Sequence, residues 1–271
     1  MKVLFLGTAA AEGWPALFCE CEACSRARAL GGRNIRTRSS ILIDEVYKVD
    51  LPPDNYLHML RYGLNLARVR YLFITHTHYD HFHPDDLLMR REPFAHIRNE
   101  EPLNIYGNEE AISGVESTVK GYPNINLKLQ LVEPFQPFKA GGLRVTPLLA
   151  DHKGDRKPLL YLFEGCGRVI LHGYDSGWFP EETWRFLNGY VIDLAILDCT
   201  SGALPTARYH MGIDCLLRVK ERMLSEGLAG KDTIFVATHF SHNGGLLHDE
   251  LESKLEPEGV KVAFDGLKIE V

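Results

Sequence analysis

The chain has 271 residues, of which 45% are hydrophobic and 24% charged, so it can build a large core. Its formal net charge is −6 and it has no basic tract, which argues against electrostatic binding of nucleic acid. No stretch approaches the ~20 apolar residues of a membrane span. The apolar run near the N-terminus is too short for a secretion signal, and we expect a cytoplasmic protein without membrane contact.

Short apolar runs rich in β-branched residues recur along the chain and predict strands. Those runs cover 2–7, 39–44, 46–50, 70–75, 103–106, 127–132, 143–149, 159–164, 168–172, 193–198, 233–238 and 260–271. The last run has Asp265-Gly266 at its centre, which is typical of a β-hairpin turn.

Helical patterns separate some of these runs, at 55–66, 84–91, 108–119, 180–188, 212–225 and 246–255. Pro84 and Pro180 suit the first positions of two of these helices. We find no repeat and no linker, so we expect one domain over residues 1–271. Runs of strands with helices interspersed favour two packed sheets with helices outside.

Polar residues that bind metals follow four of the predicted strands. His76 follows 70–75, Asp151-His152 follows 143–149, and Asp175 and His239 come after two later strands. Strand ends are rigid and can aim side chains from distant parts of the chain at one point. The sequence therefore predicts a single site at the tips of these strands.

The stretch HTHYDHFH, residues 76–83, is the densest of these clusters. His76 and His78 are two residues apart, which places both on one side of an extended segment. Asp80 and His81 follow at a turn and can face a second centre. Imidazole and carboxylate groups suit zinc, manganese or iron, and two ions with a shared ligand fit this set better than one. A loop of solvated histidines is the alternative, and His83 is read as a turn or helix-cap residue.

HTHYDH resembles the H-x-H-x-D-H signature of the metallo-β-lactamase superfamily, and the later strand-end residues follow in that family's order. The resemblance implies an αββα four-layer sandwich. It also implies two metal sites: His76, His78 and His152 at one, Asp80, His81 and His239 at the other, and Asp175 as the bridge. His78 stands where the redox di-iron branch has glutamate, so the chain resembles the hydrolytic branch.

Three of the six cysteines, Cys19, Cys21 and Cys24, lie within six residues. A long chain with its own core does not need a disulfide framework, so three clustered thiolates favour a structural zinc in an N-terminal loop at about 19–24. Such a site needs a fourth ligand, for which His242 is the candidate. Reduced, unliganded thiols are the alternative.

This order of motifs is similar to that of the phosphoribosyl cyclic phosphodiesterase family of phosphonate breakdown. That resemblance implies a structural zinc completed by a histidine, and a catalytic histidine that matches His210 in ARYHMGI. The B protein of pyrroloquinoline quinone biosynthesis has a similar cysteine loop, but it is expected to lack the full H-x-H-x-D-H.

We therefore predict a dinuclear phosphodiesterase that acts on a small, linear or cyclic, phosphodiester. Two ions hold a bridging water, and the resulting hydroxide attacks phosphorus. His210 is the candidate general acid, although a histidine at a helix start can also have no chemistry. Asp80, as a metal ligand, completes the catalytic set.

Four basic residues near the predicted site, Lys153, Arg156, Lys157 and Arg208, could anchor a phosphate, and a solvated charged loop explains each equally well. Lys153 and Arg208 are the candidates for substrate contact. His172 either orients a ligand or packs in a strand.

Three other functions are compatible with the same fold. The first is hydrolysis of a lactone or thioester by the same metals, the second is a biosynthetic role without hydrolysis, and the third is RNA processing. The acidic balance argues against long RNA. The sequence is also compatible with a homodimer.

Overall fold

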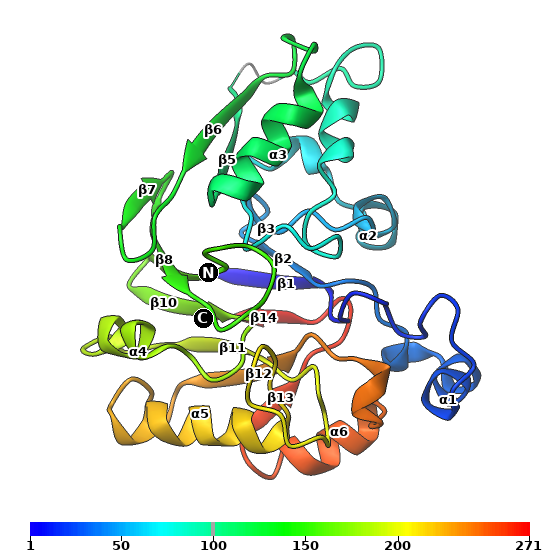
Figure 1. Cartoon of the computed structure of the whole chain (residues 1–271), viewed down its shortest axis with the longest axis vertical. Helices are drawn as coiled ribbons and strands as arrows, with labels where there is room; N and C mark the ends of the chain where they lie inside the picture. Colours follow the sequence, from blue (N-terminus) through cyan, green and yellow to red (C-terminus); the bar gives the residue numbers. More distant parts are fainter. Residues whose placement is uncertain (99–100) are drawn as a thin grey trace.

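The computed structural model describes residues 1–98 and 101–271, and these residues form two seven-stranded sheets packed face to face (Figure 1). The first sheet has the order β14-β1-β2-β3-β4-β5-β6, and the second has the order β13-β12-β11-β10-β9-β8-β7. The strands of the first sheet are β1 (Lys2–Gly7), β2 (Ser40–Ile43), β3 (Tyr47–Val49), β4 (Tyr71–Phe73), β5 (Leu103–Gly107), β6 (Leu127–Leu131) and β14 (Lys268–Glu270). Those of the second are β7 (Phe138–Ala140), β8 (Leu143–Leu149), β9 (Leu159–Gly165), β10 (Arg168–Gly173), β11 (Leu194–Asp198), β12 (Ile234–Thr238) and β13 (Val260–Val262).

In each sheet, the strands are paired antiparallel in one half and parallel in the other. Strands β3 to β6 are parallel in the first sheet, and β10 to β13 are parallel in the second. The carboxyl ends of parallel neighbours meet at one edge of a sheet. The segments after β10, β11 and β12 therefore start side by side, and they carry Asp175, Thr200 and His239.

The sheets bury large apolar side chains between them, including Phe5, Phe73, Tyr161 and Phe163, none of which is exposed to solvent. Helices cover the two outer faces. They are α1 (Glu22–Leu30), α2 (Asn55–Tyr62), α3 (Glu109–Val119), α4 (Glu181–Leu187), α5 (Ile213–Ser225) and α6 (His248–Leu255). Figure 1 shows α2 and α3 beside the first sheet and α4, α5 and α6 beside the second. None of the helices within the described ranges has the length and hydropathy needed to cross a bilayer.

The predicted helices are present with ends that shift by a few residues, except that 84–91 is a 3₁₀ helix over Pro84–Arg90. Pro180 precedes α4 as its N-cap residue instead of opening it. The sequence reading missed α1, because its residues are polar and mostly exposed and carry only a weak apolar stripe. It also missed β7, which has three residues.

The predicted C-terminal hairpin is wrong. Strand β13 pairs in parallel with β12 in the second sheet, whereas β14 pairs antiparallel with β1 in the first. Asp265-Gly266 therefore carries the chain from one sheet to the other. The Asp265 carboxylate accepts hydrogen bonds from the Thr37 amide and hydroxyl, both at 2.7 Å, and from the Thr8 hydroxyl at 2.8 Å. The residue joins three distant segments.

Replacing Asp265 with alanine should lower the free energy of unfolding by about 2–4 kcal/mol, because buried donors on Thr8 and Thr37 lose their acceptor. Urea unfolding measures the change. Asp249→Ala is the matched control, since the Asp249 side chain is 85% exposed, and it should stay within about 0.5 kcal/mol of the wild type. Equal effects of the two substitutions would contradict this role.

Candidate metal centres

The first donor group consists of His76, His78 and His152, which come from the loops after β4 and β8. His76 Nε2 lies 3.1 Å from His78 Nδ1, and His152 Nε2 lies 3.1 Å from the same atom. Nitrogen ligands of a tetrahedral zinc lie about 3.3 Å apart, given Zn–N bonds of about 2.0–2.1 Å. Gly154 makes room for this group, because a Cβ there would lie 2.5 Å from His78 Nε2.

The second group consists of Asp80, His81, Asp175 and His239, all buried. His81 Nε2 lies 3.3 Å from His239 Nε2 and 3.1 Å from Asp80 Oδ2. His239 Nε2 lies 3.0 Å from Asp175 Oδ1. These spacings also match the edges of a small coordination polyhedron of nitrogen and oxygen ligands.

Asp175 lies between the two groups. Its Oδ2 atom is 3.2 Å from His81 Nε2 in the second group. The same atom is 3.9 Å from both His76 Nε2 and His152 Nε2 in the first. One carboxylate can therefore reach both centres, as a bridging ligand must.

The far nitrogens of the ligand histidines are held by neighbouring groups. His81 Nδ1 lies 2.6 Å from Asp50 Oδ2, and the Asp50 carboxylate also accepts hydrogen bonds from the amide and hydroxyl of Thr75. His152 Nδ1 donates to the carbonyl of Tyr209 at 3.0 Å. Such partners fix the tautomer and ring orientation of a metal ligand. Sequence reading missed Asp50, although it ends the strand-like stretch VYKVD.

Within the second donor group, charge is shared between carboxylates and imidazoles. Burial opposes a charge on His239, but the carboxylates of Asp175, Asp80 and Asp198 together outweigh burial and raise the pKa of His239 to about 10. Neighbouring carboxylates likewise outweigh burial at His81 and raise its pKa well above its usual value. By contrast, burial holds the pKa of His76 well below its usual range. Metal ions that bind here must replace protons on His81 and His239.

His210 lies beside both donor groups. Its ring centroid is 4.9 Å from that of His152 and 5.6 Å from that of His239. His210 Nδ1 lies 3.0 Å from Asp198 Oδ2, and since a carboxylate only accepts, Nδ1 carries the hydrogen. Burial opposes the charged ring, but the carboxylates of Asp198 and Asp175 together outweigh burial and raise the pKa of His210.

Asp198 is a second residue that sequence reading missed. It is fully buried at the end of β11, where its Oδ1 accepts hydrogen bonds from the amides of Thr200 and Met211, each at 2.9 Å. In the sequence, Asp198 directly follows the apolar run DLAIL. That position could have marked it as a site residue, because other predicted strands in this chain are also followed by candidate ligands.

The four basic residues divide into two pairs. Lys153 and Arg208 are exposed and flank the ring of Tyr209, at 4.5 and 5.0 Å from its centroid. In the sequence, Lys153 is next to His152, and Arg208 is two residues before His210. Lys157 pairs instead with Glu133 at 2.5 Å, and Arg156 lies 3.9 Å from Glu109 and Glu110. Lys157 and Arg156 therefore take part in ion pairs on the surface.

His172 packs inside β10 and does not contact the ligand side chains through its ring nitrogens. Both nitrogens are buried without a hydrogen-bond partner among the described residues, and the ring lies 4.1 Å from that of Tyr174. Of the two readings of His172, packing in the strand matches the structure.

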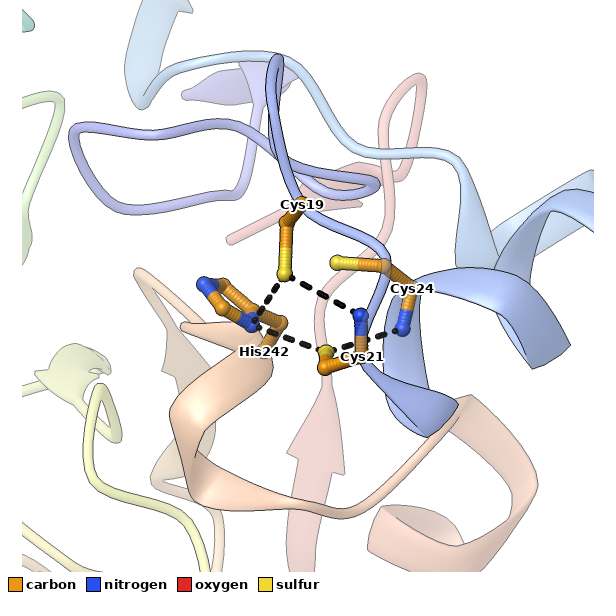
Figure 2. Close-up of side chains that lie close together, drawn as sticks. All are labelled: Cys19, Cys21, Cys24 and His242. Carbon is orange, nitrogen blue, oxygen red and sulfur yellow. Dashed lines mark hydrogen bonds between the residues drawn. The ribbon is translucent and has the colours of Figure 1, made fainter.

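A separate cluster joins Cys19, Cys21, Cys24 and His242, as Figure 2 shows. The four donor atoms lie within 4.8 Å of one another. His242 Nδ1 is 3.3 Å from Cys21 Sγ and 3.7 Å from Cys19 Sγ, and a tetrahedral zinc would place such atoms about 3.5 Å apart. The Cys24 amide donates to Cys21 Sγ and is the main cause that lowers the pKa of Cys21 to about 6. Cys21 thus favours thiolate, the form that binds metal, whereas burial raises the pKa of Cys24 to about 11.

A family model described as a Beta-lactamase superfamily domain matches residues 41–240. The chain belongs to this superfamily. The predicted metallo-β-lactamase fold, two packed sheets with outer helices, is therefore confirmed.

Two solved structures and one curated protein are similar to this chain, over different shares of its length. A crystal structure of a diphosphatase from the PhnP family has a TM-score of 0.77 and 25% identity, and the alignment covers 100% of this chain and 97% of that one. Zinc-bound PqqB from Methylobacterium extorquens has a TM-score of 0.74 and 19% identity, with 100% of both chains covered.

The curated protein is coenzyme PQQ synthesis protein B of Bradyrhizobium diazoefficiens, 25% identical over 169 residues. The match covers 53% of this chain and 49% of that protein, so the chain spans about half the length of the curated relative that it matches. PhnP-like and PqqB-like proteins thus share this fold.

Replacing Cys21 with serine should remove one zinc ion per chain and leave the metals of the His/Asp site bound, because the two clusters share no ligand. Elemental analysis of the purified variant gives the count. Cys166→Ser is the control, since Cys166 is an exposed, isolated cysteine, and its metal content should not change. An unchanged zinc content in Cys21→Ser would refute the structural zinc.

Proposed function

We propose that the chain is a dinuclear metal-dependent phosphodiesterase that acts on a small phosphodiester. The observation that carries the proposal is the place of Asp175, whose Oδ2 atom lies within 3.9 Å of nitrogens from both donor groups. Such a bridge holds two ions close enough to act on one phosphoryl group.

The donor set fits the metals. The first group offers three imidazole nitrogens, and the second offers two imidazoles and two carboxylates, all at coordination spacing. This set suits zinc, manganese or iron, and the cysteine cluster suits zinc. Two divalent ions in the His/Asp site would supply an activated water and neutralise negative charge on the phosphoryl oxygens. The chain's own residues must then orient the substrate and deliver a proton.

His210 is the proposed proton donor. Because Nδ1 donates to Asp198, the second nitrogen, Nε2, is left to hold the proton for the leaving oxygen. The side chain is 29% exposed, so a substrate can reach it. Asp198 also accepts hydrogen bonds from two backbone amides, which fixes the direction of the imidazole.

Two cations favour an anionic substrate over a neutral one. Lys153 and Arg208 flank Tyr209 at the rim of the site and carry no ion pair among the described residues. The overall charge of −6 leaves this rim as a local positive feature. Similarity to the PhnP-family diphosphatase over almost the whole of both chains supports phosphorus–oxygen chemistry.

Purified protein should hydrolyse bis-p-nitrophenyl phosphate and a 2′,3′-cyclic nucleotide faster than a panel of lactones and thioesters, because the cationic rim and paired metals favour an anionic phosphoryl centre. A diphosphate ester belongs in the same panel. Comparison of kcat/KM values decides the ranking. Faster turnover of a lactone or thioester would overturn the phosphodiesterase proposal and favour the second candidate function.

His210→Ala should lower kcat for a cyclic nucleotide by about 10²–10⁴-fold with unchanged metal content, because an alkoxide leaving group needs a proton. The loss should be much smaller for bis-p-nitrophenyl phosphate, since p-nitrophenolate leaves without one. His96→Ala is the control, because the His96 side chain is 78% exposed. Equal losses on both substrates would mean that His210 is structural.

A further inference from the structure

A cavity of about 220 Å³ lies in the outer layer of the first sheet and is lined by none of the candidate metal ligands. Strands β3, β4 and β5 form its floor, and α2 and the 3₁₀ helix Pro84–Arg90 form its walls. Its lining is mainly apolar and includes Leu51, Met59, Leu72 and Leu103. Apolar cavities with a few polar groups are typical ligand sites.

Lys48 is the unexpected residue of this cavity. Its neighbours on β3, Tyr47 and Val49, face the core between the sheets, so Lys48 faces the outer layer. It is only 2% exposed. Its Nζ atom donates to Ser40 Oγ at 2.6 Å and to the carbonyl of Asp50 at 2.5 Å, both uncharged acceptors. One of its three N–H groups therefore has no acceptor among the described residues.

The remaining polar groups leave the cavity short of negative charge. Arg90 has a buried Nε without a hydrogen-bond partner and forms no ion pair among the described residues. Asp86 is the one carboxylate in the lining, and Asn55 Nδ2 donates to it at 2.8 Å. Lys48 and Arg90 thus share the lining with a single carboxylate, that of Asp86. Burial lowers the pKa of Lys48 to about 7, although the carboxylates of Asp50 and Asp86 partly oppose this shift.

We propose that this cavity binds a small aliphatic monocarboxylate, with the carboxylate at Lys48 and Arg90 and the alkyl chain among Leu51, Met59, Leu72 and Leu103. A volume of 220 Å³ corresponds to about seven water-sized groups. That size suits a chain such as pentanoate. Charge-assisted hydrogen bonds stabilise the carboxylate end of the ligand, and burial of apolar surface stabilises its alkyl chain.

The proposal is tested by ligand-observed NMR titration of the full chain with pentanoate, 1-pentanol and pentylamine, three probes of similar size and different charge. Pentanoate should bind at least about tenfold more tightly than the other two, given the strength of charged hydrogen bonds. Equal or tighter binding of 1-pentanol or pentylamine, or no binding of pentanoate, would overturn it. Because the readout is binding alone, the result does not depend on the proposed phosphodiesterase activity.

Two variants locate the site. Lys48→Met replaces a buried cation by an apolar side chain of similar length, a change that folded proteins tolerate, and it should remove the preference for pentanoate over 1-pentanol. Met59→Trp keeps Lys48 and fills the cavity, so it should weaken pentanoate binding at least tenfold. Leu60→Trp, on the exposed side of α2 with 60% exposure, is the matched control and should bind like the wild type. Unaltered pentanoate binding in Met59→Trp would refute the location.

Discussion

The metal site depends on one constraint, the close approach of lone pairs that need positive charge between them. His78 Nδ1 lies 3.1 Å from ring nitrogens of both His76 and His152, and ring nitrogens of His81 and His239 lie 3.3 Å apart. In a buried position such contacts are unfavourable unless protons or cations separate them. The fold has to hold these donors in place, and it does so by placing them at the ends of strands from two packed sheets.

Much of this site could be predicted because each ligand stands next to an apolar strand in the sequence. The HTHYDH motif, and His152, Asp175 and His239 at later strand ends, point to one edge of the molecule before any coordinates are known. Asp50 and Asp198 could not be recognised in the same way. Their role comes from contacts with His81 and His210, which are 31 and 12 residues away in sequence, and a lone aspartate at a strand end is compatible with many other roles.

The fold was predictable in its layers and less so in its connections. Alternating apolar runs identify strands, but they do not say which sheet a strand joins. Asp265-Gly266 has the residues of a hairpin turn, yet β13 and β14 each find a longer-range partner in a different sheet. Lys48 is a similar case, because its charge suggests a surface residue and only the packed helices show that it is buried. Tertiary packing overrides local preference at both positions.

The second donor group and the cysteine cluster are linked by one short segment, residues 239–242. His239 has a left-handed backbone with φ of 62°, a conformation that surrounding contacts must maintain. Phe240 and Ser241 supply two such contacts, through amide hydrogen bonds to the carbonyls of Thr8 and Thr200. His242 then enters the cysteine cluster. A zinc ion there would tie the N-terminal loop to the segment that presents His239.

Anomalous diffraction from crystals grown with manganese or zinc tests the central claim most directly. Two peaks are expected at the His/Asp site, on either side of the Asp175 carboxylate and about 3.5–4 Å apart. A single peak, or none, in fully loaded crystals would contradict a dinuclear centre.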